Sequence, residues 1–282
     1  MDLHETDPNR STSPGLRRSA FVGFVAAAGA AAGTLPAFAA TLSPIPEDDS
    51  AIVVERLKLT VGSDSIPAYA AWPKNASVST PSVVVVMHIW GVDASMREIV
   101  RRFAVAGYAA ICPDLYARFG APSGDNNDDF SVFRPYAKQL QRPQFVGDLS
   151  AAADWLSKKF AGTKTAVLGF CMGGRMAMQA ANDTGHRYAA VLPFYGSFDN
   201  VDPAKIEMPW CGSYGDRDTS IPPASVDAFV AKLSVPHDVK IYEDAGHAFM
   251  DDHRASYVPT AAADAWQRAI AFLKRYAGTP QT

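Results

Sequence analysis

The chain has 282 residues, of which 48% are hydrophobic and 20% charged, so it can bury a sizeable core as one large or two small domains. Its formal net charge of −3 provides no electrostatic attraction to nucleic acid or to anionic lipid, and we expect neither as a partner. A small neutral or anionic substrate is compatible with this charge, since local charges can differ in sign from the total.

The first 39 residues have the pattern of an export signal. Paired Arg17 and Arg18 precede an apolar, alanine-rich stretch, and Ala37 and Ala39 then form an A-x-A cleavage site. The twin arginine is typical of the Tat route, so we expect cleavage after Ala39 and a periplasmic or secreted protein without stable membrane association. A retained membrane anchor is the alternative, although the apolar stretch is short for a spanning helix, which needs about 20 residues.

The rest of the chain, residues 40–282, predicts strands that alternate with helices. A hairpin is predicted at 53–61 and 65–73, around Gly62. Further strands are predicted at 82–89, 108–115, 165–170, 189–196, 208–215 and 238–243, and helices at 93–106, 143–159, 172–183, 223–233 and 259–276. This alternation predicts an α/β fold in a single domain, with a doubly wound, mostly parallel sheet covered by helices on both faces.

One long irregular segment, residues 116–135, is rich in Asp and Asn. It is either a solvated loop or a lid over the site, and its spacing does not match a calcium-binding EF-hand loop. In open α/β sheets, ligands bind beyond the carboxyl ends of the strands. The residues that follow each predicted strand are therefore the candidates for function.

Cys171 is the first of these candidates. The stretch Gly169-Phe170-Cys171-Met172-Gly173 follows the pattern G-x-nucleophile-x-G and lies between a predicted strand and a predicted helix. The helix N-terminus beneath Cys171 favours a thiolate electrostatically. Neither G-x-G-x-x-G nor a P-loop pattern is present, so nucleotide binding is not indicated. Cys171 is predicted to be a nucleophile.

The other two cysteines, Cys112 and Cys211, lie in apolar runs typical of strands. A free cysteine in such a run behaves as a small buried hydrophobic residue. Three cysteines are too few for a disulfide framework, and an odd number leaves at least one free thiol.

A cysteine nucleophile needs a base and an acid, and in this architecture the chain order is nucleophile, acid, histidine. His247 follows a predicted strand at the catalytic edge, and His253 in the same loop is the reserve. Asp216 and Asp218 both follow the preceding strand, and Asp218 is preferred because it stands further from the strand end.

Two backbone N–H groups are predicted to hold an oxyanion. One belongs to Met172, directly after the nucleophile, and the other to Ile89, directly after the apolar run SVVVVMH at 82–88.

With these residues in place, the chain from about residue 50 to 276 resembles the dienelactone hydrolase family (carboxymethylenebutenolidases). The motifs that carry the resemblance are "GFCMGGR", "CPDLYAR", "GDRDTSIPP" and "AGHAF". The resemblance implies an α/β-hydrolase fold and a triad of Cys171, Asp218 and His247, in agreement with the positional argument. It also implies that Arg118, which closes "CPDLYAR", contacts a substrate carboxylate, a role that suits a guanidinium fork.

The sequence departs from the family pattern at two positions. His88 stands where the family commonly has a glutamate that helps to activate the cysteine, and Asp251 stands where dienelactone-specific members have a second carboxylate-binding arginine. We expect His88 to activate the thiol or, with Trp90 and Tyr195, to contact substrate. Asp251 argues against dienelactone itself as the substrate.

The chemistry of a thiolate also predicts a restricted range of substrates. A thiolate leaves a tetrahedral intermediate more readily than an ordinary alkoxide or amide, so we expect turnover of esters or lactones with a stabilised leaving group. The alternatives are a general carboxylesterase or thioesterase, and an inert ligand-binding protein of the same fold. We expect a monomer with no cofactor and no metal, because the histidines and cysteines lack any metal-ligand spacing.

Overall fold

The computed structural model describes residues 44–162 and 164–280. The export signal predicted at 1–39 lies outside these residues, so it stays a prediction, as does the domain boundary at residue 40. No helix in the described part of the chain combines the length and the apolar character needed to cross a membrane.

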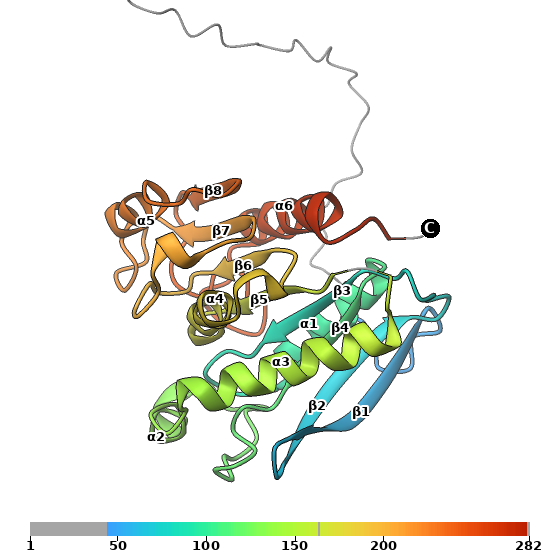
Figure 1. Cartoon of the computed structure of the whole chain (residues 1–282). Coiled ribbons are helices and arrows are strands. Elements are labelled where there is room, and N and C mark those ends of the chain that lie inside the picture. The colour runs from blue at the N-terminus through green and yellow to red at the C-terminus, as the bar shows by residue number, and fades with distance from the viewer. Residues whose placement is uncertain (1–43, 163, 281–282) are drawn as a thin grey trace, which may run out of the picture. The chain divides into compact units, whose positions relative to one another are not determined.

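The strands form one eight-stranded sheet in the order β1-β2-β4-β3-β5-β6-β7-β8 (Figure 1). β1 is antiparallel to β2 and β2 to β4, whereas the other neighbours are parallel. The mostly parallel sheet is therefore confirmed. The strands are β1 (Ile52–Val61), β2 (Asp64–Pro73), β3 (Ser82–Val86), β4 (Ala109–Pro113), β5 (Ala166–Phe170), β6 (Val191–Phe194), β7 (Trp210–Gly215) and β8 (His237–Tyr242).

Helices cover both faces of this sheet. Figure 1 shows α3 and α4 in front of the sheet, and α1 and α6 behind it. The rings of Phe103 in α1 and Trp266 in α6 lie 4.6 Å apart and join the two helices behind the sheet. The helices are α1 (Ala94–Val105), α2 (Arg134–Ala137), α3 (Arg142–Lys159), α4 (Met172–Thr184), α5 (Pro223–Val230) and α6 (Pro259–Tyr276).

The centre of the sheet is the core of the protein. Every side chain of β3, with the sequence SVVVV, is buried, as are those of β4 and β5. A continuous apolar run is stable there because helices exclude water from both faces of the strand. The β-branched valines also suit an extended backbone.

Several details differ from the sequence-based expectations, and the strand predicted at 82–89 ends at Val86. The segment predicted to be irregular, 116–135, contains a short 3₁₀ turn (Phe130–Val132) and runs into α2, which is only four residues long. So short a helix leaves no hydrophobic period in the sequence. Helix α5 ends at Val230 rather than at residue 233, because residues 231–232 form a turn.

The register of the parallel strands places their carboxyl ends at one edge. Val86 at the end of β3 is opposite Gly169 of β5, and Phe170 at the end of β5 is opposite Phe194 of β6. β7 and β8 end level with each other, at Gly215 and Tyr242. The residues that follow these strands therefore meet at one edge of the sheet.

Candidate active site

Cys171 lies in the tight turn between β5 and α4, where the sequence predicts it. Its φ of +56° and ψ of −119° are values that a residue with a side chain rarely adopts. The backbone N–H of Cys171 donates to the carbonyl of Phe194 at 3.0 Å. A side chain on Gly169 would collide with the backbone of Gly173, and one on Gly173 with the carbonyl oxygen of Val86. Both glycines are therefore needed for the turn that presents the thiol.

Asp218, His247 and Cys171 form a hydrogen-bonded chain. Nε2 of His247 is 2.9 Å from Sγ of Cys171, and Nδ1 of His247 is 2.7 Å from Oδ2 of Asp218. The second carboxylate oxygen of Asp218 accepts hydrogen bonds from the backbone N–H groups of Ser220 and Ile221, at 2.9 and 3.1 Å. The structure thus brings together the three side chains that the sequence places after β5, β7 and β8.

The surroundings of these three side chains favour the charged forms of Asp218 and His247. Burial raises the pKa of Asp218, but the hydrogen bonds from His247 and from two backbone N–H groups outweigh it, and the pKa lies below its usual value. Burial lowers the pKa of His247, but the hydrogen bonds with Asp218 and Cys171 outweigh it, and the pKa is raised. The site therefore favours a carboxylate beside an imidazolium, which complements a thiolate.

Asp216 and His253, the alternatives to Asp218 and His247, lie apart from these hydrogen bonds. Asp216 is exposed to solvent. His253 is directed toward Glu98, with its Nε2 3.5 Å from Oε2 of that residue. Asp218 and His247, which the sequence favours over them, are the residues within hydrogen-bond reach of each other.

Ile89 and Met172 each present an unused backbone donor. No described residue accepts a hydrogen bond from either N–H group. The hydroxyl of Tyr116 donates to the carbonyl of Ile89 at 2.9 Å and lies 3.8 Å from Sδ of Met172, so it links the two residues. Burial raises the pKa of Tyr116, which keeps this hydroxyl protonated. The sequence motif "CPDLYAR" contains Tyr116, but nothing in the sequence connects its hydroxyl to Ile89.

Tyr195 and Trp90 lie at the same edge. The ring of Tyr195 is edge-on to the ring of His247, with the centroids 5.2 Å apart. Trp90 lines a hollow of about 380 Å³, together with Phe130 and with Ala248, which follows His247 in the chain. A substrate contact for either residue stays a prediction.

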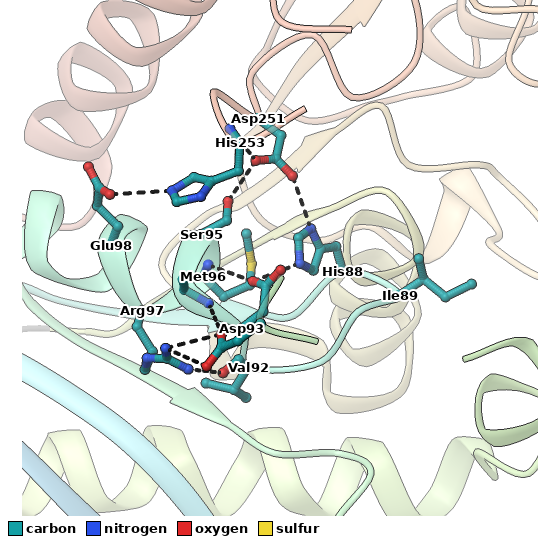
Figure 2. Close-up of polar contacts among 12 residues, drawn as sticks. His88, Ile89, Val92, Asp93, Ser95, Met96, Arg97, Glu98, Asp251 and His253 are labelled. Carbon is teal, nitrogen blue, oxygen red and sulfur yellow. Dashed lines mark hydrogen bonds and ion pairs between the residues drawn. The ribbon is translucent and has the colours of Figure 1, made fainter. Parts of the chain in front are cut away.

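His88 is held by carboxylates (Figure 2). Its Nε2 is 2.9 Å from Oδ1 of Asp93, without the alignment of a hydrogen bond, and its Nδ1 is 3.6 Å from Oδ2 of Asp251. No hydrogen bond joins His88 to Cys171 in the described residues. The thiol-activating role expected for His88 therefore finds no support in the geometry, because His247 occupies that place beside the sulfur.

Arg118 has partners that the sequence does not reveal. Its guanidinium forms a bidentate ion pair with the buried carboxylate of Asp148, in which Nη1 and Nη2 donate at 2.7 and 2.8 Å. Its Nε is 2.5 Å from Oδ2 of Asp64. The hydrogen bond with Asp148 raises the pKa of Arg118 further above its usual value. Contact between Arg118 and a substrate carboxylate stays a prediction.

The remaining two thiols are buried. Cys112 and Cys211 are free cysteines with almost no exposed surface. Burial raises the pKa of Cys112 and raises that of Cys211 to about 12. Cys171 is thus the only partly exposed cysteine, and the three cysteines of the sequence all lie in the described residues.

Comparison with known proteins identifies relatives of the chain. A sequence model of the dienelactone hydrolase family matches residues 66–277. The chain is 35% identical over 255 residues to an Escherichia coli K12 protein named "Putative carboxymethylenebutenolidase", and the match covers 85% of this chain and 93% of that protein. A protein of the same name from Methylorubrum extorquens is 30% identical over 254 residues, covering 84% of this chain and 86% of the relative.

Solved structures show the same architecture. The crystal structure of a Klebsiella pneumoniae protein named "Putative Dienelactone Hydrolase" superimposes with a TM-score of 0.73 and 31% identity, over 80% of this chain and all of that one. A dienelactone hydrolase-like promiscuous phosphotriesterase from metagenomic libraries has a TM-score of 0.67 at 24% identity, over 81% of this chain and all of that one, and supports the fold. These structures share the α/β-hydrolase fold.

Proposed function

Because the chain belongs to the dienelactone hydrolase family, whose members are hydrolases of lactone and ester bonds, we propose that it cleaves activated esters or lactones with Cys171 as the nucleophile. The observation that carries the proposal is the hydrogen-bonded chain from Asp218 through His247 to Sγ of Cys171. A nucleophile, a base within reach of it and a third group that orients the base are the elements of covalent catalysis.

The first half of the reaction forms a thioester. His247 takes the proton of Cys171, and the thiolate attacks the carbonyl carbon of the substrate. The N–H groups of Ile89 and Met172, which have no other acceptor in the described residues, hold the oxyanion. The C–O bond then breaks, and the leaving oxygen takes its proton from the imidazolium of His247.

The second half releases the acid. A water molecule gives a proton to His247 and attacks the thioester carbonyl, and the same N–H groups hold the second oxyanion. The C–S bond breaks and the sulfur regains its proton from His247. Asp218 holds the imidazole in one orientation throughout and stabilises its cationic form.

Substrates without a carboxylate suit this site best. The guanidinium of Arg118 is already paired with Asp148 and Asp64, and the position where a second arginine would bind a carboxylate holds Asp251. Arg254, the cation beside Trp90, is paired with Asp93 and Asp128. An arginine that is already paired with acidic side chains is expected to bind a substrate carboxylate weakly.

A substrate panel tests the function. Purified protein is assayed with p-nitrophenyl butyrate, with p-nitrophenyl hemisuccinate, which carries a carboxylate, and with ethyl butyrate. We expect the neutral aryl ester to be hydrolysed fastest, and Cys171→Ala to lower its turnover by at least about a thousandfold. Cys211→Ala is the matched control, because it removes a buried thiol and leaves the triad intact.

Three outcomes would contradict the proposal. Turnover that persists in Cys171→Ala would exclude the cysteine as nucleophile. Equal rates on the aryl and the alkyl ester would indicate a general carboxylesterase. Binding without turnover in the unaltered protein would indicate an inert ligand-binding protein of this fold.

We also propose that residues 1–39 are a Tat-type export signal and that the mature protein works outside the cytoplasm. The support is the order of Arg17 and Arg18, the alanine-rich stretch and the small residues up to Ala39.

A further inference from the structure

Two loops at the carboxyl edge of the sheet carry the groups of the proposed reaction. The loop after β3 carries Ile89, whose N–H is a proposed oxyanion donor, and the loop after β8 carries His247. His88 directly precedes Ile89, and Asp251 follows His247 in its loop. Figure 2 shows His88 and Asp251 facing each other, with Nδ1 of His88 3.6 Å from Oδ2 of Asp251. The two loops therefore touch through these side chains.

The contact belongs to a buried polar cluster. Oδ1 of Asp251 accepts a hydrogen bond from the hydroxyl of Ser95, at the start of α1, at 2.9 Å. Asp93, which caps α1 through the N–H of Met96 at 3.1 Å, lies on the other side of the His88 ring. The side chains of His88, Asp93 and Asp251 are each about 95% buried or more.

One guanidinium lies against both carboxylates of this cluster. Nη2 of Arg254 is 3.1 Å from Asp93, and its Nε is 3.5 Å from Asp251, so one guanidinium contacts both carboxylates. Burial raises the pKa of Asp93, but His88, the N–H of Met96 and Arg254 outweigh burial and lower it, so the carboxylate stays ionised. Two acidic side chains thus face a guanidinium and an imidazole.

A buried network of this kind resists displacement more than a surface ion pair does. Exposed ion pairs contribute little to stability, whereas removal of one partner from a buried pair leaves an uncompensated charge. If the loop of His247 moved away from α1, Asp251 would lose both the hydroxyl of Ser95 and the imidazole of His88. The cluster therefore fixes the position of one loop relative to the other.

We propose that His88 and Asp251 are positioning residues, which hold the His247 loop against the Ile89 loop so that the imidazole, the thiol and the oxyanion donors keep their mutual geometry. The inference rests on the proposed function, because it assigns a purpose to the geometry of that site. His88 thus acts on the reaction from a distance, through Asp251 and Ile89, and not on the thiol.

The test compares Asp251→Asn, His88→Gln and the double variant. Displacement of reacting groups by about 1 Å costs on the order of a hundredfold in rate, so we expect each single variant to lower kcat for p-nitrophenyl butyrate by at least about tenfold, with KM within about twofold. The double variant should be no slower than the slower single variant, since both changes break one contact. Ser95→Ala, which removes one hydroxyl, should have a smaller effect in the same direction.

A second readout does not depend on turnover. Iodoacetamide alkylates a thiolate, and Cys171 is the one cysteine that is not buried. We expect the alkylation rate of Asp251→Asn to rise with pH at higher pH values than that of the unaltered protein, because a displaced His247 no longer supports the thiolate. Asp244→Asn, in the same loop, is the matched control: Asp244 pairs with Arg217 at the surface, and asparagine tolerates its φ of +59°.

The outcomes separate the two proposals. The positioning role is wrong if both single variants lower only the melting temperature and leave kcat and the alkylation profile within about twofold of the control. It is also wrong if the two losses multiply in the double variant, since the residues would then act separately. If the unaltered protein hydrolyses no ester, the proposed function fails, and the alkylation profile still decides whether the cluster positions His247.

Discussion

Cys171 differs from Cys112 and Cys211 only in its surroundings. The two buried thiols have raised pKa values because burial penalises their charged forms. Cys171 is partly exposed and lies 2.9 Å from an imidazole whose own partner is an ionised carboxylate. The same side chain is thus inert at two positions and suited to nucleophilic attack at the third.

The charges of His247 and Asp218 predict how the stability of the protein depends on pH. The raised pKa of His247 gives stability that is complete below its unfolded value of 6.5 and is lost as pH rises toward its folded value. The lowered pKa of Asp218 gives stability that is complete above its unfolded value of 3.8 and is lost as pH falls. We therefore expect the melting-temperature difference between the unaltered protein and His247→Gln to be largest between about pH 4 and 6.5.

Thermal denaturation over a pH series measures this difference. His237→Gln, which changes an exposed histidine, is the control and should show little pH-dependent difference. A difference for His247→Gln that stays constant from acid to alkaline pH would contradict the ion pair.

At the scale of elements, the site depends on how closely α4 approaches β3. An added side chain on Gly173 in the first turn of α4 would meet the carbonyl oxygens of Val86 and Met87. Overpacking of this kind costs about 1–3 kcal/mol, so we expect Gly173→Ala to lower the free energy of unfolding by that amount. It should also slow alkylation of Cys171, because α4 would have to move away from β3.

Gly147 in α3 provides the matched substitution. An added Cβ there would make only an ordinary contact with Val61, at 3.5 Å. Alanine is favoured over glycine inside a helix by about 1 kcal/mol, so Gly147→Ala should stabilise the protein. Urea denaturation measures both variants, and equal effects of the two would show that the contact with β3 is unimportant.

The elements also show what the sequence can and cannot predict. The apolar run of β3 and the strand-turn-helix pattern around Cys171 are local, and both are confirmed. Asp218 and His247 followed from their places after strands, because parallel strands share one edge. The partners of Arg118 and His88 were not predicted, since Asp148 is buried in the middle of a helix and Asp251 is distant in the chain. Side-chain pairing between such segments has no periodic signal.

At the scale of the whole molecule, the described fold and the proposed export signal occupy separate parts of the sequence. β1 begins at Ile52, so cleavage after Ala39 removes no described strand or helix. The Tat route carries folded proteins, and all three cysteines of this chain are free, so the proposed export would require no later disulfide formation.

Processing can be measured directly. In a bacterium with a Tat system, we expect the intact mass of the exported protein to correspond to a chain that begins at Ala40. Replacement of Arg17 and Arg18 by lysine should leave the full-length chain in the cytoplasm, whereas Arg10→Lys should not. A full-length chain outside the cytoplasm would favour a retained anchor.

The contact between His88 and Asp251 also limits how the protein can evolve. Replacement of either residue alone removes this contact between the two loops, although Asp251 keeps Ser95 and His88 keeps Asp93. Single substitutions at these two positions are therefore expected to give a less stable or less active protein. Exchange of this pair for another, such as a carboxylate on the first loop and a cation on the second, requires both substitutions together.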